Sequence, residues 1–66
     1  MRRLRLQEIR EFRLLTQVQL ARQARISRIT ISRIEHGVQE ASFNTIQKLA
    51  KALSVQPNEL LEREAW

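Results

Sequence analysis

The chain has 66 residues, a formal net charge of +5, one Gly, one Pro and no Cys. This length predicts one small domain, and without Cys neither disulfides nor thiolate zinc sites can stabilise it. A hydrophobic content of 42% and a charged content of 29% are typical of a globular protein rather than a disordered one. We therefore expect closely packed helices, or a partner subunit, to supply the stability.

The charge is unevenly distributed along the chain. Residues 1–39 contain nine Arg and three Glu, which gives +6, whereas residues 40–66 contain three basic and four acidic side chains, which gives −1. Such an excess indicates a surface that faces nucleic acid or an anionic membrane, or one that is simply solvated. No apolar run approaches the roughly 18 residues that span a bilayer, and no segment resembles a signal peptide, so we expect a soluble, cytosolic protein without a membrane partner.

The spacing of apolar residues is helical along the whole chain. It predicts helices over about residues 4–13, 17–24, 28–36, 43–53 and 57–63. The first of these is expected to turn Leu6, Ile9 and Phe12 inward. Because no linker or repeat interrupts the pattern, we expect a single compact all-α domain over residues 1–66.

Local signals set the ends of these helices. Thr16 and Gln19 have the spacing of a capping box, and Ser27 and Ser42 are N-cap residues. Gly37 lies where a helix needs a left-handed residue after its end. The caps at Thr16 and Ser27 are eleven residues apart, which predicts two short helices that cross steeply in a helix-turn-helix.

The segments TQVQLA (16–21), IS (26–27) and ISRIEHG (31–37) closely resemble the phage repressor and Cro-like helix-turn-helix family, also called XRE-type regulators. Residues 49–55 and 60–61 resemble the fourth and fifth helices of that family. The resemblance implies a five-helix, lambda-repressor-like fold and a sequence-specific transcriptional regulator that binds double-stranded DNA, and we expect this regulator to be a repressor.

One face of the third helix has the chemistry to read bases. At 100° per residue, Arg28, Ile29, Ser32 and Arg33 share one side, while Ile31 and Ile34 lie on the other. Each Arg can fork onto a guanine edge in the major groove, and Ile29 can contact a thymine methyl group. The alternative is that both Arg are solvated and that Ile29 is either an isolated surface residue or part of a protein interface.

Other residues are expected to position the protein on the DNA backbone. The resemblance implies that Gln17, in the first turn of the second helix, binds a phosphate, and a helix N-terminus favours this role. Ser27, Thr30 and Asn44 are the further phosphate candidates, although Ser27 is also explained as a cap. The resemblance further implies an internal ion pair between Arg10 and Glu35.

The chain departs from the family at turns that usually contain Gly. The corresponding residues are Leu14, Arg25 and Ser54. A positive φ at such residues costs on the order of 1 kcal/mol, so either the turns are slightly remodelled or the strain is tolerated. The residue usually found before the fourth helix is Pro, and here it is Ala41, preceded by the acidic Glu40. These two changes weaken the case for backbone contacts after Gly37.

We expect a homodimer formed by the less charged second half of the chain. Val55, Leu61 and Trp66 are the interface candidates, and two half-sites of a pseudo-palindrome would lie about 34 Å apart. The main rival function is a protein-interaction module, such as an antitoxin or a regulator of another repressor, for which the apolar Val18 and Ile29 would be suited. RNA binding is less favoured because the basic face has no stacking aromatic residues.

An enzyme is not expected. Ser27 and His36 point about 180° apart on one helix, so no proton can pass between them. A lone His without Cys or clustered Asp also argues against a metal site. We expect no cofactor and no small-molecule effector.

Overall fold

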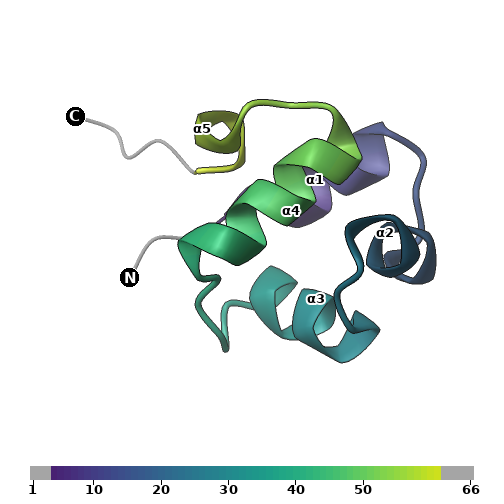
Figure 1. Cartoon of the computed structure of the whole chain (residues 1–66). Helices are drawn as coiled ribbons and strands as arrows, with labels where there is room; N and C mark the ends of the chain where they lie inside the picture. Colours follow the sequence, from purple (N-terminus) through teal and green to yellow (C-terminus); the bar gives the residue numbers. More distant parts are fainter. Residues whose placement is uncertain (1–3, 62–66) are drawn as a thin grey trace.

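A computed structural model describes residues 4–61 and confirms the five-helix, all-α fold. The helices are α1 (Leu6–Phe12), α2 (Gln17–Ala24), α3 (Arg28–Glu35), α4 (Phe43–Leu53) and α5 (Pro57–Leu60) (Figure 1). Helix α1 begins two residues later than expected because Leu4 forms an antiparallel bridge with Leu61. The same bridge ends α5 at Leu60, and residues 62–63, expected to extend that helix, lie outside the described residues.

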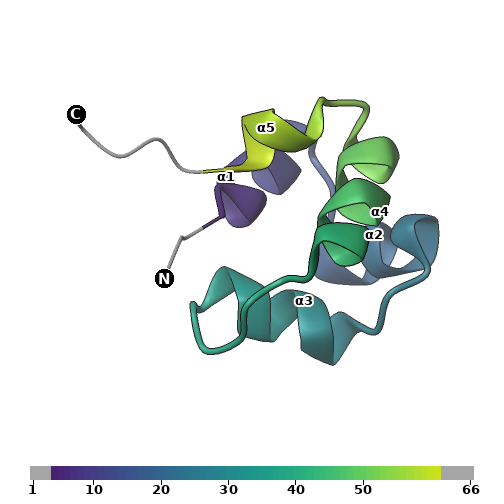
Figure 2. The same ribbon diagram turned by 60° about the vertical axis from the view of Figure 1, so that its left-hand side comes forward.

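Helix α2 contacts both α3 and α4, α4 also contacts α5, and α1 contacts α3. Figures 1 and 2 show α3 along one edge of the molecule, on the side away from α5. Within residues 4–61, no helix is long and apolar enough to cross a membrane. This arrangement leaves one side of α3 uncovered by the rest of the domain.

The core is made of aliphatic side chains from all five helices. Small residues in α2 and α4, namely Ala21, Ala24 and Ala50, allow the two helices to approach closely. The fully buried large side chains are Leu6, Leu20, Ile31, Leu49, Leu53 and Leu60. The prediction that Phe12 faces inward is wrong, because Phe12 is 83% exposed. It follows the buried Arg10 by two residues, about 200° around the helix, and therefore points away from the buried face.

Side-chain caps fix where three helices begin. The capping box before α2 is confirmed: Thr16 Oγ1 accepts from the Gln19 amide at 3.0 Å, and Gln19 Oε1 accepts from the Thr16 amide at 2.8 Å. The Ser27 hydroxyl accepts from the Thr30 amide at 3.1 Å and so caps α3. Ser42 caps α4 in the same way. The start of α3 is therefore set locally by the sequence.

Four helices end in the same way, although only one of the four turns contains Gly. Each end has one residue with positive φ, and the N–H of the following residue bonds to the carbonyl five residues earlier, at 3.0 or 3.1 Å. The positive-φ residues are Leu14 (60°), Arg25 (58°), Gly37 (74°) and Ser54 (58°). The expected strain at the three non-Gly positions is thus present, at about 1 kcal/mol each.

Candidate DNA interface

Helix α3 presents the predicted reading residues to solvent. Arg28, Arg33 and Ile29 are exposed, with Ile29 at 60%, and Ser32 is half-buried. Their opposite neighbours, Ile31 and Ile34, are buried in the core. The structure therefore brings the four residues together on one free face of the helix, and the two isoleucines hold that face in place.

Residues 12–34, which include α2 and nearly all of α3, carry positive charge that no acidic residue of the same segment balances. Between residues 12 and 34 the chain has five Arg and neither Asp nor Glu. All five are exposed, and within residues 4–61 none of them forms an ion pair. These residues are Arg13, Arg22, Arg25, Arg28 and Arg33. Because no carboxylate neutralises these side chains, the helix-turn-helix surface attracts a polyanion.

Arg10 and Glu35 form a buried ion pair that joins α1 to the end of α3. Arg10 Nε lies 2.6 Å from Glu35 Oε2, and Nη2 lies 3.1 Å from Oε1. The Nη1 group donates to the Leu15 carbonyl at 2.7 Å. The two side chains are only 10% and 1% exposed. The hydrogen bond to Glu35 raises the pKa of Arg10 and outweighs burial, which acts to lower it, so Arg10 is charged at neutral pH.

Gln17 also joins this network, a contact that the sequence analysis missed. Its Nε2 donates to Glu35 Oε1 at 2.9 Å, which ties the start of α2 to the end of α3. A primary amide has two N–H donors, so one N–H donor remains for a phosphate. The contact spans 18 residues, and no local pattern indicates it.

The other phosphate candidates fall into two places. Ser27 and Thr30 lie together at the start of α3, where their hydroxyl oxygens are 2.9 Å apart. Asn44 is exposed in the first turn of α4 and is not joined to them by any hydrogen bond in the described part of the chain. The structure thus groups Ser27 and Thr30 beside the reading face, and it leaves Asn44 on a separate helix.

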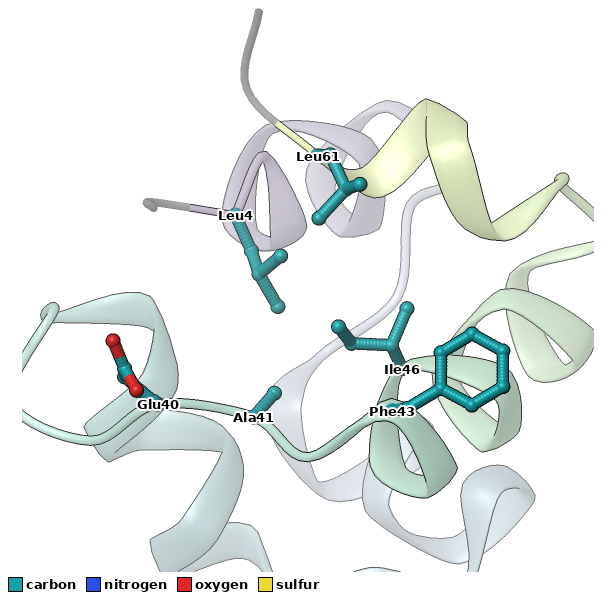
Figure 3. A pocket seen from close by; sticks show the side chains of 6 residues that line it. All are labelled: Leu4, Glu40, Ala41, Phe43, Ile46 and Leu61. Carbon is teal, nitrogen blue, oxygen red and sulfur yellow. The ribbon is translucent and has the colours of Figure 1, made fainter. Parts of the chain in front are cut away.

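The dimer candidates are spread more widely. Val55 and Leu61 are half-buried, and Trp66 lies outside the described residues. Leu61 lines an apolar groove of about 340 Å³, and Figure 3 shows Leu4, Ile46 and Leu61 pointing toward one another across it. Glu40, Ala41 and Phe43 complete the lining. Phe43, at 70% exposed, was missed because the predicted apolar stripe of α4 begins only at Ile46, three residues later.

The fold and the free face of α3 define a helix-turn-helix DNA-binding protein. Residues 6–60 match the protein-family model described as Helix-turn-helix. The chain is 40% identical over 60 residues to "Control protein C.BamHI" of Bacillus amyloliquefaciens, a match that covers 85% of this chain and 74% of the relative. It also resembles the crystal structure of the restriction-modification controller protein C.AhdI from Aeromonas hydrophila, with a TM-score of 0.81, 36% identity and 83% of each chain covered.

The chain therefore belongs to the helix-turn-helix family, of the Cro/C1 or XRE type. This confirms the resemblance carried by residues 16–37. The protein is a DNA-binding transcriptional regulator, and its partner is double-stranded DNA.

Proposed function

We propose that this protein represses transcription of restriction–modification genes by binding a pseudo-palindromic operator in the cytoplasm of a prokaryotic cell. The observation that carries the proposal is the free α3 face, whose arginines form no ion pair within residues 4–61 and lie in a segment, residues 12–34, that has no Asp or Glu. The assignment to restriction–modification genes is supported by the similarity to C.AhdI, which is a controller of such a system. Binding alone performs this function, without a cofactor, a catalytic step or a small-molecule effector.

The side chains on one face of α3 read the bases. The helix has eight residues, about 12 Å of length, and the major groove is about 12 Å wide. Arg28 and Arg33 each donate two hydrogen bonds to guanine O6 and N7, and Ile29 packs on a thymine methyl group. Ser32 adds a hydroxyl that can donate or accept. These contacts select the sequence.

A second group of side chains positions the protein on the DNA backbone. Gln17 directs its remaining amide donor to a phosphate, while Glu35 holds the amide in place through the 2.9 Å hydrogen bond. The hydroxyl groups of Ser27 and Thr30 bind the phosphate at the start of α3, and Asn44 binds a phosphate near α4. These contacts bind every DNA sequence equally and set the register of α3.

Two copies bind the operator as a homodimer. Residues 40–61 contain two Lys and two Glu, a net charge of zero, so copies that meet through this half do not repel each other. The groove and the exposed Phe43 beside it lie on one face, as a self-complementary twofold contact requires. We include Leu61, which lines the groove, together with Val55 and Trp66 in this interface. The two copies of α3 then reach major grooves about 34 Å apart.

The DNA-binding proposal is tested by selecting bound sequences from a random duplex pool at physiological salt, followed by footprinting. We expect an enriched pseudo-palindrome with two protected half-sites on one side of the duplex. The matched control is the double variant Arg28→Ala/Arg33→Ala, which should not enrich the same motif. A wild-type pool without enrichment would contradict the proposal and favour the protein-interaction module instead.

The dimer is tested by sedimentation equilibrium with two matched aromatic substitutions. Phe43→Ser removes the exposed ring beside the groove, and Phe12→Ser removes an equally exposed ring on α1. We expect Phe43→Ser to shift the protein toward monomer, while Phe12→Ser leaves its mass unchanged. Equal masses for wild type and Phe43→Ser would show that this face does not join the copies.

A further inference from the structure

Arg25, in the turn between α2 and α3, has an unfavourable backbone conformation. Its φ and ψ are 58° and 45°, in the left-handed region, where a residue with a Cβ atom is strained. Ser54 at the end of α4 provides an internal comparison, with φ and ψ of 58° and 42° and the same closing hydrogen bond. Glycine would relieve the strain at either position.

No interaction of the Arg25 side chain within residues 4–61 offsets this strain. The side chain is exposed, and within residues 4–61 it forms neither a hydrogen bond nor an ion pair. Leu14 and Ser54 have the same positive φ and are also exposed, so the strain alone does not assign a role to Arg25. What distinguishes Arg25 from these two residues is its positive charge and its place beside the start of α3.

The surroundings of Arg25 point to a phosphate. Arg25 is two residues before Ser27, the cap of α3, and three before Arg28 on the reading face. No acidic residue lies between residues 12 and 34, so no side chain of this segment competes for the guanidinium. A guanidinium matches phosphate oxygens with two parallel hydrogen bonds and stays charged at any physiological pH.

We propose that Arg25 binds a backbone phosphate of the operator beside the start of α3, in addition to the contacts made by Gln17, Ser27 and Thr30. This inference rests on the proposed DNA binding and adds to it a contact that a chain with Gly in this turn cannot make. The contact contributes to affinity without sequence preference. The strain at Arg25 is then the cost of placing a cation where the turn itself favours glycine.

The test compares Arg25→Asn and Arg25→Lys with the wild type on the selected operator and on a random duplex, over a series of salt concentrations. Asn tolerates the left-handed conformation, so the turn is kept while the charge is lost. We expect Arg25→Asn to lower the slope of log affinity against log salt by about 0.9, which is about 8-fold in affinity between 1 M and 0.1 M salt. Both duplexes should be affected equally, and Arg25→Lys should retain most of the slope.

Two controls separate this contact from general effects. Lys51→Gln removes one exposed charge from the last turn of α4, and Ser54→Gly relieves the matching strain there. We expect Ser54→Gly to melt several degrees higher than wild type with unchanged DNA binding, and Lys51→Gln to change the slope less than Arg25→Asn does.

Three results would overturn the assignment. One is an unchanged slope in Arg25→Asn, and another is an equal fall in Lys51→Gln, which would assign the effect to net charge. In both cases the proposed function stands, because the wild type still binds its operator. A wild type that binds no duplex overturns the proposed function and the Arg25 contact together.

Discussion

Replacing Arg10 by Met tests whether the buried ion pair holds the domain together. Met keeps the apolar stem but leaves the Glu35 carboxylate, 1% exposed, with Gln17 as its remaining side-chain donor. Removing one partner of a buried pair costs about 3–5 kcal/mol. A 66-residue domain has a total stability of roughly 3–10 kcal/mol, so the loss is a large part of the whole. We expect Arg10→Met to melt at least ~12 °C below wild type.

The double variant Arg10→Met/Glu35→Leu separates the ion pair from its burial cost. Because the uncompensated carboxylate is gone, we expect the melting temperature to recover most of the loss. Gln17 then lacks the acceptor that orients its amide, so operator affinity should stay below that of wild type. Circular dichroism melts and fluorescence-anisotropy titrations measure the two effects. An Arg10→Met melt within 2 °C of wild type, or a double variant no more stable than the single one, would refute the reasoning.

Three further predictions follow from the same structure. Arg33→Ala should lose about 1–3 kcal/mol of operator binding and relax the preference at one base position, whereas Gln17→Ala should weaken binding to all sequences alike. If both variants lose the same affinity for the operator and for random DNA, the division between base-reading and phosphate-binding residues is wrong. Leu14→Gly should stabilise the domain by about 1 kcal/mol in thermal melts, because Leu14 has positive φ and its side chain, 89% exposed, makes little contact with the core. An unchanged melting temperature would show that the turn is not strained. The pKa of Arg10 is raised in the folded state, so its contribution to stability is complete below the ordinary arginine pKa and is lost only as the pH rises through the folded value. The difference in unfolding free energy between wild type and Arg10→Met/Glu35→Leu, measured by chemical denaturation, should therefore be constant between about pH 7 and 10. A marked fall of this difference across that range would contradict the prediction.

Features with local causes were predictable from the sequence. The capping box at Thr16 depends on residues three apart, and the positive φ at Leu14, Arg25 and Ser54 depends on where each helix ends. The sequence left open whether these three turns are remodelled or strained, whereas the capping box can be deduced without knowing how the helices pack. The same holds for the face of α3, because the spacing of its two buried isoleucines determines which residues are left outside.

Contacts between distant segments were harder to predict. The hydrogen bond from Gln17 to Glu35 depends on the crossing of α2 and α3, which the helical spacing does not specify. The groove beside Phe43 depends on the bridge between Leu4 and Leu61, two residues near opposite ends of the described chain. The position of Phe12 was misjudged because α1 turns Arg10, rather than a third apolar residue, toward the core. A buried arginine has no signature in an apolar pattern.

The exposed residues of α3 are separate from the buried residues that hold this helix in place, and this separation affects how the DNA specificity of such regulators can change. The buried isoleucines and the Glu35 network hold the helix from behind, and the side chains of Arg28, Ile29 and Arg33 are exposed in front. These outward residues can therefore be exchanged as a set without disturbing the interior. Transplanting the corresponding residues of another controller onto this scaffold should transfer its operator preference while the melting temperature barely changes. New specificities are then within reach of a few substitutions on a domain that otherwise stays the same.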